Sequence, residues 1–437
     1  MQTTPTVLSR LAASRRSVLL GGGLLGAGVL TGIAGAAQAR SAALSASVLP
    51  ATQAVLDRYI AEQKLPGATV GVRLPDGSEA FLQAGKLDFG DAPAVTRDSL
   101  FRIYSMTKPI TGAAAALLIE EGRLTLDTPV ADFIPEFANL TVAVDPALSL
   151  DARPAATVMT IRHLLTHTSG LTYSISGDGP VQREYRRLGV FPFTGDLGAA
   201  PGDGPRVRDL DAMAAALARI PLLADPGTAY NYSVSLDVMG LVIQRASGMS
   251  FPDFVQRRLF DPVGMDHTQW RLGAGEARNL ARIYDYSNGG RVPDAGASAE
   301  AYSAPVTLYA GGAGLISTAR DYLSFLSTIL NDGRSGRVTV MKPETARLIH
   351  SDIMPPTLSQ DGNGYGFGGF VVRPGSSDAG QYGWDGAAGT KAWIDPARRY
   401  AAVMMVQFFP WAVVGIANEV RAAVQADIAR IPATVSA

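Results

Sequence analysis

The chain has 437 residues, which is enough for one large domain or two ordinary ones. Its 47% hydrophobic and 18% charged residues are typical of a soluble enzyme, and its formal net charge of −1 offers no field that would attract nucleic acid or an anionic membrane. We therefore expect no nucleic-acid partner. The absence of cysteine excludes disulfides, thiolate metal sites and cysteine nucleophiles.

The first 39 residues have the layout of an export signal. Arg15 and Arg16 precede a Gly-rich apolar run at residues 18–37, which ends in an Ala-Gln-Ala cleavage-like site. The sequence around the two arginines is similar to the twin-arginine motif, which directs export of folded proteins. An uncleaved membrane anchor is the alternative, but the many glycines and the Ala-x-Ala site favour cleavage. We expect a periplasmic or secreted protein with no stable membrane partner after cleavage.

Residues 40–120 are predicted to form a helix, an antiparallel hairpin and a second helix. Apolar residues at helical spacing indicate the helices, and apolar runs on either side of a Pro-Asp-Gly-Ser turn indicate the hairpin. The expected bounds are 52–63 for the first helix, 68–74 and 79–83 for the strands, and 110–119 for the second helix.

Residues 121–296 are predicted to be a mostly helical insertion. Short helices broken by prolines come first, and the segment at residues 173–208 is dense in Gly, Pro and Asp, which is typical of long surface loops around a site. The longer helices are expected at residues 160–167, 210–220, 235–246 and 251–259.

Strand patterns return near the end of the chain. The expected strands are residues 311–318, 366–372, 389–395 and 400–408, and the expected helices are residues 319–330 and 414–431. Strands at both chain ends with helices between them predict an α+β fold, in which an antiparallel sheet is flanked by helices. The sheet domain would comprise residues 40–120 and 297–437, and the helical domain residues 121–296.

A candidate nucleophile occurs in the sequence Ser-Met-Thr-Lys-Pro, which begins at Ser105. Residues three apart share a helix face, so the Ser105 hydroxyl and the Lys108 ammonium can meet. Pro109 is tolerated only in a first helical turn, which places Ser105 near a helix N-terminus. A lysine can serve as the base for a serine when burial favours its neutral form. The pattern also fits an ordinary helix start with a capping serine, because Ser-x-x-Lys is common by chance.

Five short motifs follow one another along the chain. They are Ser-Met-Thr-Lys at 105–108, Leu-Leu-Thr-His-Thr-Ser-Gly-Leu at 164–171, Tyr-Ser-Val at 232–234, Gly-Ala-Gly-Leu-Ile-Ser-Thr at 312–318 and Trp-Asp-Gly-Ala-Ala-Gly-Thr at 384–390. Their order and spacing resemble the serine β-lactamase and penicillin-binding-protein superfamily, and most closely its class C-like esterase branch, the family VIII carboxylesterases. The resemblance implies a β-lactamase-like fold.

The resemblance also implies catalytic roles. Ser105 would attack an acyl carbon, Lys108 and Tyr232 would share the base and proton-shuttle work, and the backbone N–H groups of Ser105 and Ala387 would form the oxyanion hole. The alternative for Tyr232 is a core tyrosine with a satisfied hydroxyl. Its place between a Pro-Gly turn and a capping Ser233 favours the catalytic role.

Two departures from the lactamase pattern favour uncharged esters. Val234 stands where the lactamase motif ends in Asn, and Trp384 stands where the later motif begins with Lys or His. A cation at that position would pair with the carboxylate of a β-lactam or a peptide end. We expect Val234, Trp384, Asp385 and Gly386 to contact substrate, although a plain buried aromatic is an equally good interpretation of Trp384.

Other chemistries have less support. The chain has only four histidines and no Gly-x-Ser-x-Gly elbow for a Ser-His-Asp hydrolase. His163 and His167 could present two metal ligands on one helix face, but without an accompanying Glu or Cys a satisfied helix end is the better interpretation. The glycine clusters lack the Lys-Ser/Thr of a phosphate-binding loop. We expect no metal and no cofactor.

The sequence therefore predicts an exported serine carboxylesterase that cleaves small-molecule esters through an acyl-enzyme on Ser105. A β-lactamase or D-amino-acid peptidase with the same machinery is the alternative. A non-catalytic relative that binds peptidoglycan is disfavoured, because a binding module does not need Ser105, Lys108 and Tyr232 together. Acyl transfer to an acceptor other than water and the oligomeric state stay open.

Overall fold

The computed structural model describes residues 45–192, 202–287, 289–294 and 297–431 of the chain. The predicted export signal lies outside the described residues, so it stays a prediction. None of the helices within these ranges combines the length and the apolar character needed to cross a membrane.

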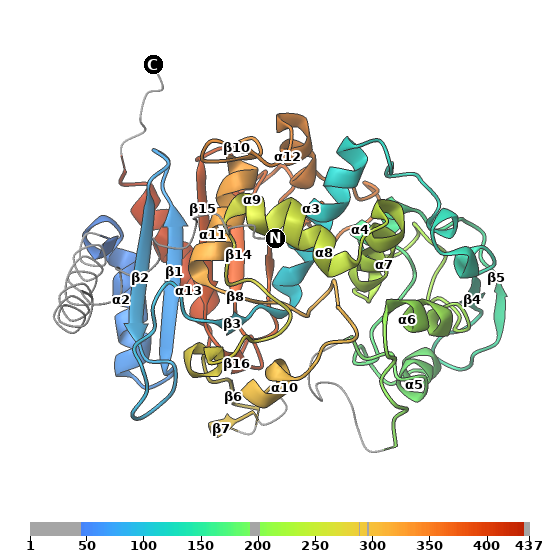
Figure 1. Cartoon of the computed structure of the whole chain (residues 1–437), viewed down its shortest axis with the longest axis horizontal. Coiled ribbons are helices and arrows are strands. Elements are labelled where there is room, and N and C mark those ends of the chain that lie inside the picture. The colour runs from blue at the N-terminus through green and yellow to red at the C-terminus, as the bar shows by residue number, and fades with distance from the viewer. Residues whose placement is uncertain (1–44, 193–201, 288, 295–296, 432–437) are drawn as a thin grey trace, which may run out of the picture.

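A seven-stranded antiparallel sheet, built from both ends of the described chain, forms the centre of the fold (Figure 1). Its strand order is β11-β12-β13-β14-β15-β1-β2. The two ends meet where β1 pairs with β15, which places Val70 opposite Met404. Every residue of these two strands is buried, so both faces of the sheet need a cover of helices. The strands are β1 (Gly67–Arg73), β2 (Glu79–Gly85), β11 (Gly364–Tyr365), β12 (Phe370–Val371), β13 (Tyr382–Asp385), β14 (Lys391–Asp395) and β15 (Tyr400–Met405).

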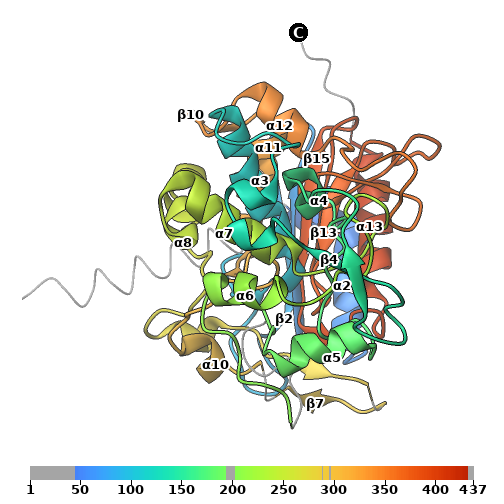
Figure 2. The same ribbon diagram turned by 90° about the vertical axis from the view of Figure 1, so that its right-hand side faces the viewer.

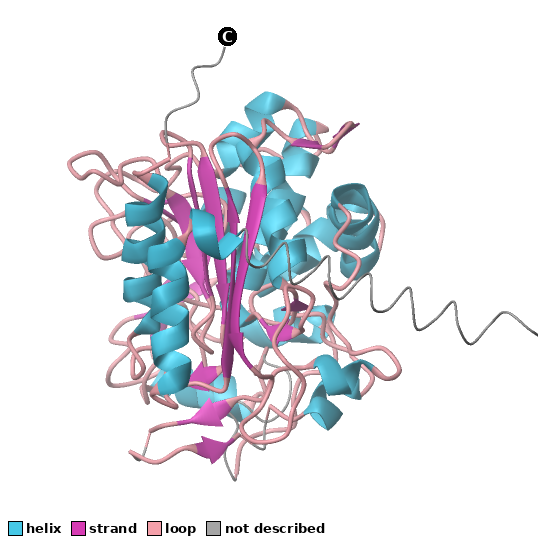
Figure 3. Cartoon of the chain, turned by 90° about the vertical axis from the view of Figure 1, so that its left-hand side faces the viewer, coloured by secondary structure: helices cyan, strands magenta, loops and turns pink. Residues whose placement is uncertain are grey.

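Helices from the two chain ends cover one face of the sheet (Figure 3). They are α2 (Pro50–Ala61) and α13 (Ile416–Ile428), which pack on an apolar cluster that includes the buried ring of Trp393. Asp427 accepts hydrogen bonds of 2.8 Å from both the N–H and the hydroxyl of Thr52. The end of the chain thereby caps a free donor at the start of α2.

Helices α3 (Thr107–Glu120) and α11 (Ala319–Leu330) cover the other face. Helix α3 is buried along nearly its whole length, because it lies between the sheet and α7 (Ser235–Ser247) (Figure 1). This packing requires a glycine, since a Cβ at Gly112 would lie 2.3 Å from the carbonyl oxygen of Phe367. The helix that follows the candidate serine is therefore held from both sides.

Most of the remaining helices gather beyond α3, on one side of the molecule (Figures 1 and 2). The helices are α4 (Ile161–Leu165), α5 (Pro180–Arg187), α6 (Leu210–Leu217), α8 (Phe251–Val255), α9 (Asp261–Val263), α10 (Ala299–Ser303) and α12 (Pro343–Ile349). The first five of these come from the region 121–296 that was predicted to be helical, whereas α10 and α12 come later in the chain. The division into two domains stays a prediction.

Short elements complete the described chain. The small strands are β3 (Phe101–Arg102), β4 (Thr141–Ala143), β5 (Ala152–Pro154), β6 (Tyr284–Asp285), β7 (Val292–Pro293), β8 (Ile316–Ser317), β9 (Arg334–Ser335), β10 (Val338–Thr339) and β16 (Phe408–Phe409). The 3-10 turns are η1 (Tyr104–Met106), η2 (Val130–Asp132), η3 (Pro135–Phe137) and η5 (Glu276–Asn279), and η4 (Gln256–Phe260) is a π-helix.

The α+β class and the antiparallel sheet are confirmed, but three predicted strands are wrong in extent. Residues 311–318 do not join the main sheet, because only β8 forms there and it pairs with β3. Residues 366–372 bend where the Gly366 N–H donates to the Gly369 carbonyl, so β11 and β12 replace a single strand. The strand predicted at 400–408 ends with β15, and β16 then pairs in parallel with β6.

Candidate active site

Ser105 lies in the turn η1, between strand β3 and helix α3. Its neighbour Tyr104 has a φ of +41°, a conformation that is rare outside glycine and costs about 1–3 kcal/mol. Pro109 occupies the first turn of α3, where a missing N–H leaves no hydrogen bond unmade. The chain therefore turns sharply just before the helix and leaves Ser105 half-buried between buried neighbours.

Lys108 and Tyr232 both reach the hydroxyl of Ser105. The Lys108 Nζ donates to Ser105 Oγ at 3.1 Å, and the Tyr232 hydroxyl donates to the same oxygen at 2.7 Å. Lys108 is 0% exposed, and its Nζ also donates to the Gly312 carbonyl at 2.7 Å. The three residues that the motifs singled out thus meet around one oxygen atom, although 127 residues separate Ser105 from Tyr232.

Tyr232 is positioned by His167, which the sequence assigned to a helix end. The His167 carbonyl accepts from the Asn231 N–H at 2.8 Å, and its Nδ1 accepts from the Ser233 N–H at 3.2 Å. Its ring lies 4.7 Å from the Tyr232 ring. Burial lowers the pKa of His167 well below its usual range, and the nearby charge of Lys108 lowers it further. His167 is therefore a neutral support beneath the tyrosine.

His163 does occupy a helix end, as the sequence predicted. Its Nδ1 accepts from the Thr160 N–H at 3.1 Å at the start of α4. His167 also lies at the end of this helix, directly after its C-cap Thr166, and its φ of +55° turns the ring toward Tyr232. Within the described residues, no three His, Cys, Asp or Glu side chains gather as a metal site would require.

Asp237, to which no sequence motif pointed, supports Lys108 through the backbone of Gly312. Its Oδ1 accepts from the Gly312 N–H at 2.8 Å, while the carbonyl of that residue holds the lysine. A Cβ at Gly312 would lie 2.6 Å from Asp237 Oδ2 and 3.0 Å from the Tyr173 hydroxyl, so only glycine fits. Complete burial raises the pKa of Asp237 to about 7, against the opposing effect of the Lys108 charge.

A cavity of about 350 Å³ opens above Ser105. Trp384 forms one wall, where its Nε1 donates to the Tyr232 hydroxyl at 3.3 Å and its ring packs 5.1 Å from that of Tyr365. Four lining residues were not identified from the sequence, among them Trp411, which is 60% exposed on the loop after β16. The cavity is lined by Ser105, Tyr232, Gln360, Asp361, Phe370, Trp384, Asp385, Gly386, Ala387 and Trp411.

This lining carries carboxylates but no arginine or lysine among the described residues. Asp361 and Asp385 are the two acidic groups. Asp385 also binds Lys391, whose Nζ lies 2.6 Å from its Oδ2, and the lysine side chain is only 9% exposed. Lys391 on strand β14 is thus already paired with Asp385. The described lining of the cavity therefore offers no counter-ion to an anionic substrate.

The predicted substrate-contacting residues differ in where the structure places them. Trp384, Asp385 and Gly386 do line the cavity, and so do the expected oxyanion residues Ser105 and Ala387. Val234, however, is 0% exposed and belongs to the core. It lies two residues beyond Tyr232 at the start of α7, where residues two apart do not share a face.

The fold and this arrangement of residues are those of a known protein family. The Beta-lactamase family matches residues 52–427, and the chain belongs to it. The protein is accordingly a serine hydrolase of the β-lactamase superfamily, and the predicted resemblance to this superfamily and its esterase branch is confirmed.

Several relatives cover most of the chain. It is 35% identical over 353 residues to uncharacterized protein MT1414 of Mycobacterium tuberculosis (strain CDC 1551 / Oshkosh), which covers 76% of this chain and 84% of that protein. It is 31% identical over 386 residues to Esterase EstB of Burkholderia gladioli, with 83% and 91% covered. Among solved structures it resembles EstCE1, "a hydrolase with promiscuous acyltransferase activity", with a TM-score of 0.71, 26% identity, and 87% and 99% covered.

Proposed function

We propose that the protein is an exported carboxylesterase that cleaves small, uncharged esters through an acyl-enzyme on Ser105. The observation that carries this proposal is the convergence of Lys108 and Tyr232 on Ser105 Oγ, at the floor of a cavity with an aromatic wall and no cation in its described lining. The relationship to Esterase EstB supports the same reaction class.

The reaction would begin with attack of Ser105 Oγ on the ester carbonyl carbon while Lys108, in its neutral form, takes the hydroxyl proton and passes one on to Tyr232 as the tyrosine gives up its own. The carbonyl oxygen becomes an oxyanion, held by the backbone N–H groups of Ser105 and Ala387. When the intermediate collapses, the carbon–oxygen bond to the alcohol breaks and Tyr232 returns a proton to the leaving oxygen. Water then attacks the acyl-enzyme by the same steps and releases the acid and free Ser105.

The cavity favours a neutral substrate over a β-lactam. Trp384, Phe370 and Trp411 offer apolar surface, whereas the Asp361 carboxylate would repel the carboxylate of a penicillin or cephalosporin. A charge-assisted hydrogen bond to such a carboxylate is worth about 1.5–3 kcal/mol. Its absence lowers kcat/KM for a β-lactam by roughly ten- to a hundredfold.

The deciding experiment compares kcat/KM for p-nitrophenyl acetate and butyrate with that for nitrocefin and a penicillin, on one preparation, with Ser105→Ala as the blank. We expect the esters to be turned over much faster. A β-lactam that matched or exceeded the better ester would replace the esterase with a β-lactamase or D-amino-acid peptidase.

Acyl transfer is a second candidate, which the description of EstCE1 as a hydrolase with promiscuous acyltransferase activity favours. Trp411, which is exposed, lines the same cavity as Ser105, so an alcohol can approach the acyl-enzyme from solvent in place of water. Adding an alcohol acceptor to the ester assay and measuring the ratio of new ester to free acid tests this. A ratio no higher than that of the Ser105→Ala blank would reject acyl transfer.

A further inference from the structure

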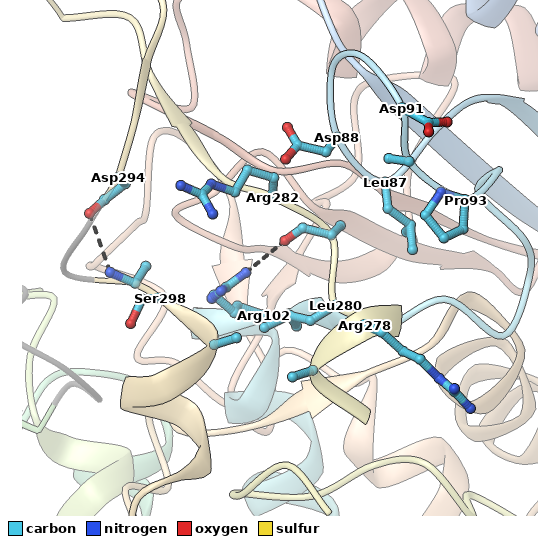
Figure 4. Close-up of a pocket in the computed structure, with 15 residues that line it drawn as sticks. Leu87, Asp88, Asp91, Pro93, Arg102, Arg278, Leu280, Arg282, Asp294 and Ser298 are labelled. Atoms are coloured by element: carbon cyan, nitrogen blue, oxygen red, sulfur yellow. Dashed lines mark hydrogen bonds between the residues drawn. The ribbon is translucent and has the colours of Figure 1, made fainter. Parts of the chain in front are cut away.

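Charge distinguishes the cavity above Ser105 from a second cavity of about 240 Å³, with which it shares no lining residue (Figure 4). The second cavity has charges of both signs in its lining, namely Arg102, Arg278, Arg282, Asp88, Asp91 and Asp294. The described lining of the cavity above Ser105 has charged groups of one sign, Asp361 and Asp385. Its preference among charged substrates therefore depends on how each of these two carboxylates is paired.

Asp385 is neutralised by Lys391. The lysine Nζ donates to the two carboxylate oxygens at 2.8 Å and 2.6 Å, and the lysine side chain is only 9% exposed. The register of β13 against β14 places these two residues opposite each other, so the pair is built into the sheet. At so short a separation the two unit charges largely cancel for a substrate that lies farther away.

Asp361 supplies a negative charge that no described cation neutralises. It accepts a hydrogen bond of 2.5 Å from the neutral Gln360 Nε2 and forms no ion pair with the lysines, arginines or histidines that the structure describes. A tight turn fixes its position: φ is +49° at Asp361 and +85° at Gly362, and the flanking Gln360 and Asn363 exchange two backbone hydrogen bonds of 2.9 Å. Asp-Gly is favoured in such a turn, because both central residues need a positive φ.

Aromatic rings form the apolar part of the same lining. Trp384, Phe370 and Trp411 contribute them. The Trp384 ring is held in place, since Tyr365 packs edge-on against it with 5.1 Å between the ring centres and Phe370 lies 6.2 Å away. The face of an aromatic ring is electron-rich and attracts cations, and tryptophan does so most strongly. Aromatic faces beside a carboxylate therefore suit a quaternary ammonium group, which needs no hydrogen bond.

We propose that the cavity selects esters that carry an alkylammonium group, which the Asp361 carboxylate attracts and the rings of Trp384, Phe370 and Trp411 shelter. This selection rests on the esterase reaction proposed above and names the substrate class that this reaction accepts best. Uncharged esters remain substrates, because the ester group that reacts at Ser105 is the same in both. The carboxylate that repels an anionic β-lactam gives a cationic ester the advantage over a neutral one.

The preference is expected to be moderate. Asp361 is exposed, so solvent and salt screen its charge, and an ion pair at such a position contributes little. Contact with the aromatic faces adds a comparable amount. Together they should favour a cationic ester over a neutral ester of the same shape by about three- to tenfold in kcat/KM.

The test uses pairs of esters that match in shape and differ in charge. Acetylcholine and its isostere with carbon in place of nitrogen differ in the alcohol, whereas the p-nitrophenyl ester of trimethylammoniobutanoic acid and its carbon isostere differ in the acyl group. The cationic ester should have the higher kcat/KM in at least one pair, which identifies the part of the substrate that carries the cation. The ratio should fall as the ionic strength rises from about 0.01 M to about 0.5 M.

The failure of this inference is distinct from the failure of the esterase. Turnover of the neutral esters with a ratio near one in both pairs would overturn the inference and leave the esterase intact. No turnover of any ester above the Ser105→Ala blank would reject the esterase, and the inference with it.

Asp361→Asn should lower the ratio about two- to threefold and leave the part that is due to the rings. Asparagine tolerates a positive φ, so the turn is retained. Asp91→Asn is the matched control: Asp91 is also exposed and its substitution removes the same charge, but it lines the second cavity (Figure 4). This variant should keep the wild-type ratio. Equal ratios in the two variants would overturn the role of Asp361.

Discussion

Ser105 Oγ is hydrogen-bonded to two groups that differ in chemistry, the side-chain nitrogen of Lys108 and the phenol of Tyr232. Each of them can be substituted singly, which measures its separate contribution to turnover. The Ser105→Ala variant, which lacks the nucleophile, gives the baseline for both.

Lys108→Ala and Tyr232→Phe should each lower kcat by about 10²–10⁴-fold while substrate binding changes little, because proton transfer is needed mainly in the transition state. Steady-state kinetics with p-nitrophenyl butyrate measure this. A fluorophosphonate probe should label wild-type protein at Ser105 and leave Ser105→Ala unlabelled. An adduct mapped by mass spectrometry to another serine, or near-normal turnover in both variants, would reject the mechanism.

Trp411 should influence which acyl group is accepted. Trp411→Ala removes an apolar wall of the cavity, so kcat/KM for the butyrate ester should fall about five- to tenfold, and that for the acetate ester should fall less. Val413→Ala is the control, because Val413 is similarly exposed on the same loop but does not line the cavity. Equal losses for both esters would argue against a role in acyl selection.

Asp237 should make stability depend on pH. Its pKa of about 7 in the fold exceeds the ordinary value of 3.8, so the stabilisation is complete below about pH 4 and is lost as the pH rises to about 7. Asp237→Asn cannot ionise and keeps an acceptor for Gly312. Relative to wild type, the variant should gain about 4 kcal/mol in free energy of unfolding between pH 4 and 7. Urea titrations at several pH values measure the difference, and a constant difference would contradict the assignment.

The sequence identified Ser105, Lys108 and Tyr232 because short motifs carry them. Asp237 and Trp411 could not be found in this way. Asp237 acts through the backbone of Gly312, a contact between segments 75 residues apart, and it follows an ordinary helical pattern on α7. Trp411 lies in a loop with no periodicity. Val234 is buried at the start of α7, which motif spacing does not reveal, because spacing says nothing about the direction of a side chain.

At the scale of elements, helices were predicted more accurately than strands. The predicted helix at residues 319–330 is confirmed as α11, since its apolar stripe and its capping Thr318 mark it locally. Residues 311–318 were misjudged because their glycines permit close packing of the chain. A Cβ at Gly311 would lie 2.4 Å from the Leu236 carbonyl oxygen, so this segment packs against α7 and does not extend the sheet.

Helix α3 provides the element-scale prediction. Gly112→Ala places a methyl group against the Phe367 carbonyl, in a helix packed on both sides, and should cost about 1–3 kcal/mol in free energy of unfolding. It should also lower kcat, since the helix carries Lys108. Gly290→Ala is the control, because a Cβ there meets no atom within 4 Å. Equal stability of the two variants in urea titration would show that α3 can move aside.

For the whole molecule, the export proposal depends on the paired arginines of residues 1–39. Arg15→Lys together with Arg16→Lys should leave the protein inside the cytoplasm, because the twin-arginine motif requires both. Arg10→Lys, which alters the same region outside the motif, should not. Fractionation followed by N-terminal sequencing measures the outcome, and the mature chain should begin near Arg40. An intact Met1 on exported protein would instead indicate a retained anchor.

The pairing of β1 with β15 also determines when the chain can fold during its synthesis. The ribosome completes β1 at Arg73, but β15 begins only at Tyr400. At roughly 5–20 residues per second, β1 emerges about 15–65 s before its partner and keeps an open, apolar edge throughout that interval. Folding must therefore follow synthesis of nearly the whole chain, and the cytoplasm must protect the nascent strand until then. A route that exports proteins after folding suits such a chain.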